Sequence, residues 1–198
     1  MVYAFIIHTV SPGTCRIIYS SSFGQEIQII DTQRENDPAK HGSDLRTERK
    51  QNLHRVAQLV QSEFAFRRVV TGKTLDDDLL KLNNEGTLPE FELGYIRLPV
   101  DEPFQNEKIV VWMAAVNCGF TMICEKNENR SLAENVLKLL IRYLQEHLRI
   151  LNQPTEAMTK VDKIAVVLDI FLPSGQLLFM NRRLVRQFEK DLELISKG

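Results

Sequence analysis

The sequence predicts an α+β fold: an antiparallel sheet of five strands flanked by helices. Three observations lead to this class. Two apolar, β-branched segments separated by a short turn open the chain, three more strand-like segments follow the first helix, and the other helices gather at the end. The predicted order is β-β-α-β-β-β-α-α-α. We expect residues 1–198 to form one domain, with surface loops near 24–43 and 71–93.

The first two strands form a predicted hairpin. Residues 2–10, VYAFIIHTV, are mostly β-branched or aromatic, which favours a strand. No Lys or Arg precedes this run and Ser11-Pro12-Gly13 is typical of a turn, so we expect a strand of the fold and not a secretory leader. The second strand covers residues 15–23, directly after the turn.

A helix and an acidic loop separate this hairpin from the next strands. Leu53, Val56 and Val60 recur at helical spacing, which predicts a helix over residues 44–70. Residues 71–93 contain several Asp, Asn and Gly residues and a Pro, so we expect a loop with one short helical turn near 79–82.

Three further strands and three helices complete the prediction. The strands cover 94–100, 108–116 and 120–124, and Asn117-Cys118-Gly119 joins the last two as antiparallel neighbours. Ser131 and Glu134 have the spacing of a capping box at the start of a helix that extends to Leu151. Pro154 breaks that helix, a second helix spans 155–172, and Asn181 is a suitable N-cap for the last one.

The overall composition is that of an ordinary globular protein. Hydrophobic residues make up 43% and charged residues 26%, and the formal net charge of -1 gives no reason to expect nucleic acid as a partner. Cys15, Cys118 and Cys124 are an odd number without metal-ligand spacing, so we expect buried free thiols in a reducing compartment. No apolar stretch approaches the ~20 residues of a membrane span.

No catalytic residue, metal site or cofactor site emerges from the motifs. Gly72-Lys73-Thr74 matches the end of a phosphate-binding loop, but Arg67 stands where that loop requires another glycine. The alternative is a helix C-terminus, with Gly72 just past the end of the helix. The four histidines lack metal-ligand spacing, and residues 76–78 are an acidic run unlike a calcium loop. A small basic group at Arg182, Arg183 and Arg186 fits either a solvated face or a contact with phosphate headgroups or an acidic partner.

Five long segments resemble, in the same order, one known family. They are MVYAFIIHTV, CRIIYSSSFG, EPFQNEKIVVWMAAVNCGF, ENRSLAENVLKLLIRYLQEHLRIL and FLPSGQLLFMN. Together they resemble the sigma (small) subunits of adaptor protein complex 5, within the longin-like small subunits of clathrin-adaptor complexes. The resemblance implies a longin-like domain and thins in residues 25–46 and 72–91, which we predict as loops.

The resemblance implies a noncatalytic scaffold. A small subunit of this family binds the large zeta subunit directly, and beta and mu subunits complete the heterotetramer. Through the complex, the subunit is associated with spatacsin and spastizin and serves endosomal transport. The resemblance implies no nucleic-acid partner. The implied location is the cytosolic face of late endosomes and lysosomes, with peripheral membrane association through the complex. The alternatives are another longin-domain trafficking protein, such as a SNARE or a tethering-complex component, and a small nucleotide-handling enzyme.

One helix is a candidate partner-binding surface because it is apolar over much of its circumference. The candidate residues are Leu132, Val136, Leu140, Tyr143 and Leu144. The alternative is that the fold itself sandwiches this helix between the sheet and the last helices.

Arg16 matches the arginine with which related small subunits contact acidic dileucine sorting signals. The basic residues that those relatives carry in the middle strand pair are missing from IVVWMAAVNCGF. We therefore expect dileucine binding to be weak or absent.

Overall fold

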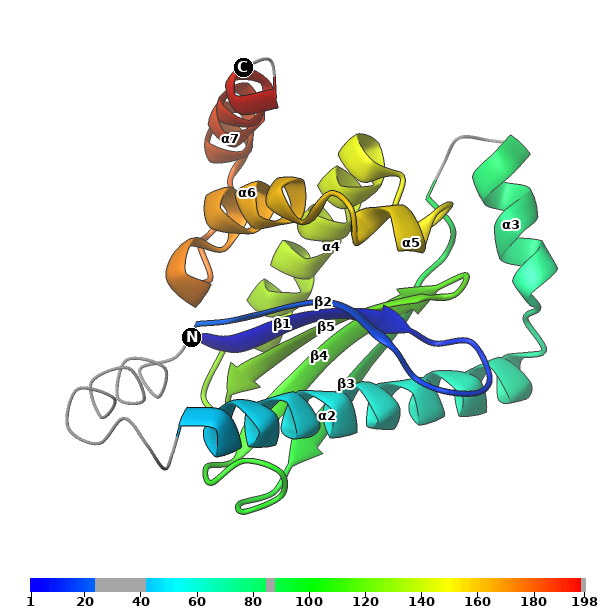
Figure 1. Ribbon diagram of the computed structural model, residues 1–198. Helices are drawn as coiled ribbons and strands as arrows, with labels where there is room; N and C mark the ends of the chain where they lie inside the picture. Colours follow the sequence, from blue (N-terminus) through cyan, green and yellow to red (C-terminus); the bar gives the residue numbers. More distant parts are fainter. Residues whose placement is uncertain (24–41, 85–87, 197–198) are drawn as a thin grey trace.

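The computed structural model describes residues 1–23, 42–84 and 88–196 and confirms the predicted α+β class. Its centre is an antiparallel five-stranded sheet with the strand order β2-β1-β5-β4-β3 (Figure 1). The N-terminal hairpin and the later three-strand unit therefore meet where β1 pairs with β5. The strands are β1 (Val2–Thr9), β2 (Ile17–Ser22), β3 (Glu92–Leu98), β4 (Lys108–Ala115) and β5 (Cys118–Glu125).

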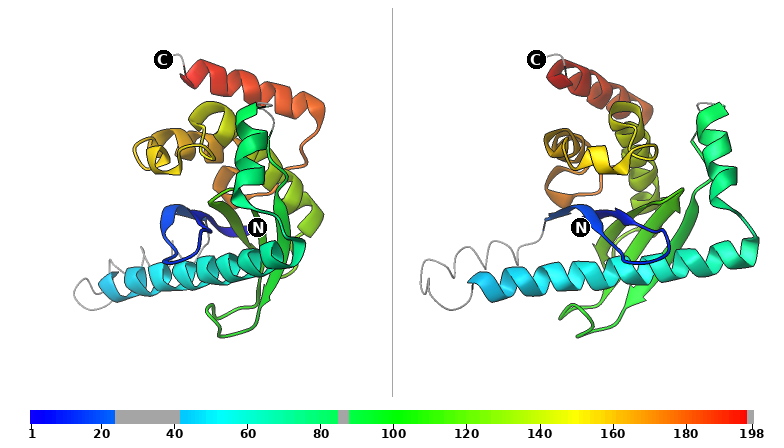
Figure 2. Two further views of the ribbon diagram at one scale, coloured as in Figure 1. Left: turned by 90° about the vertical axis from the view of Figure 1, so that its right-hand side faces the viewer. Right: turned by 45° about the vertical axis from the view of Figure 1, so that its right-hand side comes forward.

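Helices cover both faces of this sheet. One long helix, α2, crosses one face, whereas α4 and α6 lie over the opposite face (Figures 1 and 2). The helical elements are α2 (Gly42–Thr71), α3 (Leu75–Asn84), α4 (Arg130–Leu148), α5 (Pro154–Ala157), α6 (Val161–Phe171), the 3-10 turn η1 (Pro173–Gly175) and α7 (Arg182–Ser196).

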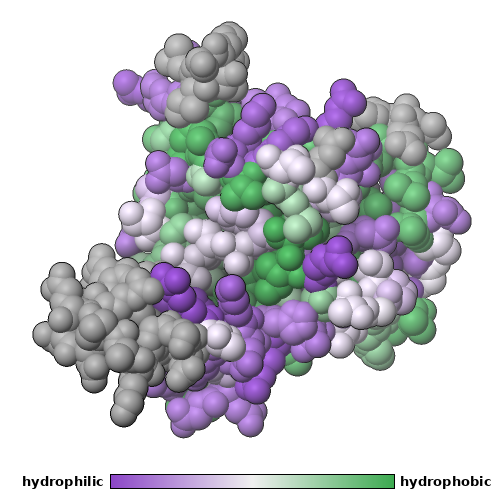
Figure 3. All heavy atoms as spheres, in the orientation of Figure 1, coloured by the Kyte–Doolittle hydropathy of each residue, from purple (hydrophilic) through white to green (hydrophobic). Residues whose placement is uncertain are grey.

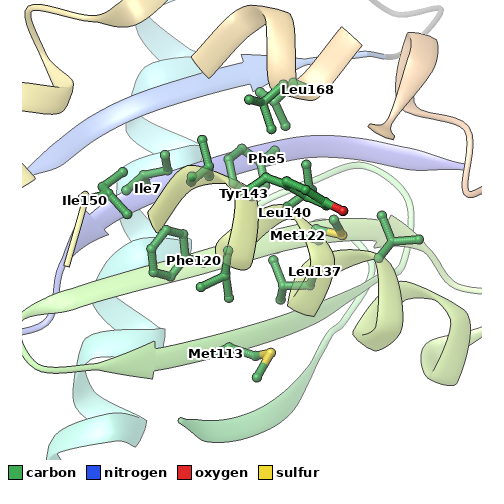
Figure 4. Close-up of a cluster of buried hydrophobic side chains, with 14 of the residues drawn as sticks. Phe5, Ile7, Met113, Phe120, Met122, Leu137, Leu140, Tyr143, Ile150 and Leu168 are labelled. Atoms are coloured by element: carbon green, nitrogen blue, oxygen red, sulfur yellow. The ribbon is translucent and has the colours of Figure 1, made fainter. Parts of the chain in front are cut away.

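The central strands alternate their side chains between two cores. On β1, Phe5 and Ile7 join the core under α4 and α6, whereas Ala4 and Ile6 join the core under α2. Figure 4 shows the first of these clusters, in which side chains of the sheet meet those of α4 and α6. Because both faces are covered, β1, β4 and β5 are apolar at nearly every position, which explains their continuous hydrophobic runs in the sequence.

Two predicted helix ends are confirmed and one is corrected. Gly72 ends α2 in the left-handed region, at φ 66°, and its N–H donates to the carbonyl of Arg68 at 2.9 Å. Asn181 caps α7 by accepting a hydrogen bond from the Leu184 N–H at 2.9 Å. The predicted cap at Ser131 is wrong: Asn129 caps α4 and accepts from the Leu132 N–H at 3.0 Å.

The predicted loop at 71–93 contains a ten-residue helix, α3. Its start is a capping box in which the Thr74 N–H donates to the Asp77 carboxylate at 2.9 Å and the Asp77 N–H returns a bond to the Thr74 hydroxyl. The acidic residues that suggested a loop therefore lie at the N-terminal end of the helix dipole, where negative charge is stabilising. The predicted loop at 24–43 lies outside the described residues, apart from the start of α2.

The helical segment predicted over 155–172 is divided into α5 and α6. Residues 158–160 separate the two helices, and the Met158 and Lys160 N–H groups donate three residues back, to Thr155 and Ala157. The chain therefore makes a tight turn between two helical pieces at this point.

Candidate partner-binding surface

The predicted contact residues on α4 lie largely inside the protein. Val136, Leu140, Tyr143 and Leu144 are buried, and only Leu132 is partly exposed. Figure 4 shows Leu140 and Tyr143 between the sheet and α6. The structure thus agrees with the alternative, in which the fold itself sandwiches this helix. The sheet covers one apolar side of α4, and α6 covers the other. In this conformation the four buried side chains form no contact surface, and a partner contact through α4 stays a prediction.

Tyr143 instead holds three helices together. Its ring stacks on that of Phe171 in α6, with 4.5 Å between the ring centroids. Its hydroxyl donates to the Glu189 carboxylate of α7 and accepts a bond from Arg142 at 2.7 Å. Burial, followed by the hydrogen bond to Glu189, raises the pKa of Tyr143 to about 12. Its role here is therefore to join α4, α6 and α7.

Arg16 is exposed just before β2. Its backbone is fixed by two contacts with Thr9: the Thr9 N–H donates to the Arg16 carbonyl, and the Arg16 N–H donates to the Thr9 hydroxyl, both at 2.9 Å. The nearby Val10 N–H donates to the Asn117 carbonyl, so Arg16 lies at the same sheet end as the β4–β5 turn. Whether Arg16 contacts a sorting signal stays a prediction.

The Gly72-Lys73-Thr74 motif forms the junction between α2 and α3. Gly72 ends α2 and Thr74 caps α3, while the Lys73 ammonium lies 3.1 Å from the Glu90 carboxylate and 3.3 Å from that of Glu92. A helix precedes the motif, where a phosphate-binding loop would follow a strand. All three residues therefore have structural roles in this junction.

A buried ion pair at the same junction was missed by the sequence reasoning. Asp78 is 4% exposed, and its carboxylate accepts bonds from the Arg68 guanidinium and from the Val116 N–H, the latter at 3.0 Å. It therefore links α2, α3 and the β4–β5 turn. The available signal was the apolar spacing of Leu79 and Leu82, which places Asp78 on the inward face of a helix.

The three cysteines are buried and free, as predicted. Burial raises the pKa of the Cys118 thiol, and it is the main reason that the pKa of Cys124 rises to about 12. Both thiols therefore stay protonated at neutral pH and are poor nucleophiles. Within residues 1–23, 42–84 and 88–196, no group of three His, Cys, Asp or Glu side chains could hold a metal ion. No helix in the same ranges is long and apolar enough to cross a membrane.

His8 is also committed to packing. It is fully buried on the α2 side of the sheet, where its Nε2 lies 3.0 Å from the Thr121 hydroxyl and its Nδ1 lies 3.2 Å from the Thr9 carbonyl. Burial is the main reason that its pKa falls to about 4.

A group of exposed apolar side chains lies on the C-terminal part of α2 and on α3. Figure 3 shows apolar side chains over this corner of the molecule. We call Leu59, Phe66, Val69 and Val70 the α2 stripe; their exposed fractions are 45%, 69%, 83% and 68%. In α3, Leu80 is 59% exposed. Because its side chains are accessible in this conformation, this surface is a further candidate partner-binding surface.

Comparison with known proteins gives consistent matches to one family. The pattern of the family described as AP-5 complex subunit sigma-1 matches residues 1–193. The human AP-5 complex subunit sigma-1 is 36% identical over 199 residues, covering 96% of each chain. The mouse protein of the same name is 34% identical over 160 residues, covering 77% of this chain and 91% of its own. The chain therefore belongs to the AP-5 complex subunit sigma-1 family.

Proposed function

We propose that this adaptor-complex small subunit stabilises the large zeta subunit and acts without catalysing a reaction. The observation that carries the proposal is the family match over nearly the whole chain. An exposed apolar surface on α2 and α3 supports it, because such a surface suits a subunit that is covered by a partner in its assembly. The buried cysteines and His8 also favour a scaffold, since their side chains serve packing.

The proposed role extends to the rest of the complex. In this proposal beta and mu subunits complete the heterotetramer, spatacsin and spastizin associate through it, and the assembly serves endosomal transport. The subunit works at the cytosolic face of late endosomes and lysosomes and reaches the membrane peripherally, through the complex. The support for these partners and this location is the family membership.

Co-expression with the N-terminal trunk of the zeta subunit tests the proposal. We expect one-to-one coelution in size-exclusion chromatography and a higher soluble yield of both chains than either gives alone. The control is the trunk of a large subunit from another adaptor complex, which should not coelute. If the chain is soluble but does not bind the zeta trunk at micromolar concentration, the direct contact is refuted.

A further inference from the structure

The α2 stripe has the geometry of a helix-packing surface. Leu59, Phe66 and Val70 follow one another at intervals of seven and four residues, so they lie along one side of α2. At its N-terminal end, Leu59 lines an open groove of about 580 Å³ between α2 and the β3 edge, together with Arg55 and Ser62. Side chains at these intervals accept the ridges of a second helix, whereas a single exposed side chain would not.

The fold holds this part of α2 in place. The Arg67 guanidinium lies 5.1 Å from the centroid of the buried Trp112 ring and donates to the Leu93 carbonyl on β3. The next residue, Arg68, pairs with the buried Asp78 of α3. Because these contacts tie the last turns of α2 to the sheet and to α3, Val69 and Val70 project from an anchored surface and not from a fraying helix end.

The charges around the stripe restrict its occupant. Beside the stripe, Arg67 is paired with Glu63 at 2.7 Å, so these two side chains add little net charge. Arg55 is exposed at one end, and Asp76 and Asp77 are exposed beyond the other. A complementary partner therefore has an apolar stripe, a carboxylate that faces Arg55 and basic side chains that face the two aspartates.

We propose that the α2 stripe is the docking site for one amphipathic helix of the large subunit, oriented by Arg55 at one end and by Asp76 and Asp77 at the other. This inference rests on the proposed function, because that function supplies the partner. It adds the location, the secondary structure and the charge pattern of the contact. The helix would cover the exposed apolar side chains of α2 and extend toward Leu80 of α3.

Charge substitutions in the stripe test the site. Phe66→Glu should weaken binding of the purified zeta trunk by at least about 30-fold, measured by biolayer interferometry, because a central aromatic residue typically dominates such a contact. Leu59→Glu is a second variant in case Phe66→Glu fails to fold. The matched control is Phe179→Glu, since Phe179 is even more exposed, at 79%, but lies beyond α6, far along the chain from α2. Arg55→Glu should reduce the association rate several-fold at low salt.

The outcomes separate the two proposals. If the wild-type chain does not bind the trunk, the proposed function fails and the inference fails with it. If the wild-type chain binds and both stripe variants, folded by circular dichroism, bind within about 3-fold of it, the stripe alone is refuted. If light scattering shows that the chain alone forms a dimer that Phe66→Glu dissociates, a second copy occupies the stripe and the inference is overturned. Loss of binding in the stripe variants but not in Phe179→Glu supports it.

Discussion

Replacing Asp78 with alanine should strongly destabilise the protein. The substitution leaves the Arg68 guanidinium, whose side chain is 13% exposed, without its carboxylate, and leaves the buried Val116 N–H without an acceptor. Breaking a buried pair costs about 3–5 kcal/mol, and an unsatisfied buried N–H costs about 1–3 kcal/mol. Because Arg68 retains some contact with water and can reorient, we expect a combined loss of about 3 kcal/mol.

The conformation of Val116 adds to the expected effect. Its φ is 56°, which is unfavourable for a β-branched residue, and such backbone persists only where surrounding contacts fix it. The hydrogen bond to Asp78 is one of those contacts. The loss of Asp78 should therefore loosen the β4–β5 turn as well as the junction between α2 and α3.

Urea unfolding followed by the fluorescence of Trp112, the single tryptophan, measures this loss. A change of about 3 kcal/mol should lower the midpoint by about 1 M or more. Asp76→Ala is the control, because Asp76 is exposed in the same turn and should change stability by less than about 0.5 kcal/mol. A double-mutant cycle with Arg68→Ala isolates the pair. A coupling energy below about 0.5 kcal/mol would show that the ion pair is not what stabilises this junction.

Two further changes probe the core under α2. Gly94→Ala should cost about 2 kcal/mol in urea unfolding, because a Cβ atom there would lie 2.4 Å from the Trp112 ring; stability within about 0.5 kcal/mol of wild type would contradict this packing. The folded pKa of His8, about 4, is below the reference value of 6.5, so the unfolded chain binds more protons between these values and stability falls as the pH drops through this window. We expect a loss of about 2 kcal/mol between pH 7 and pH 5, which His8→Gln should largely abolish; an equal loss in that variant would assign the effect to other groups.

The sheet could be predicted because its strands have strong and simple signals. Since helices cover both faces, β1, β4 and β5 are continuous apolar runs, and the connections from β1 to β2 and from β3 to β4 contain Gly or Pro. Helix ends were predictable where one residue decides them, as Gly72 and Asn181 do. The position of β3 was predicted less accurately. It begins at Glu92, two residues before the predicted start, because the pairing with β4 and not the residue type sets its start.

The junction between α2 and α3 could not be predicted from composition. An acidic run is usually solvated, and the sequence does not show that Asp78 would meet Arg68, ten residues away, and a backbone N–H 38 residues away. Only the three-dimensional arrangement turns one of three consecutive aspartates into a buried partner. The same run supplies Asp77 for the cap of α3, so adjacent residues of one type have different roles.

Apolar periodicity alone does not show which helix surface remains accessible to a partner. The pattern indicates how much of a helix surface is apolar, but it does not distinguish burial within the chain itself from burial by a partner. In α4, α6 covers the additional apolar side, so the strongest signal in the sequence belongs to the core. In α2, exposed apolar residues are dispersed among Arg, Gln and Glu, so the helix as a whole has a polar composition. A partner surface on a small subunit is therefore better sought where apolar side chains remain exposed on an anchored helix, which in this protein is the α2 stripe.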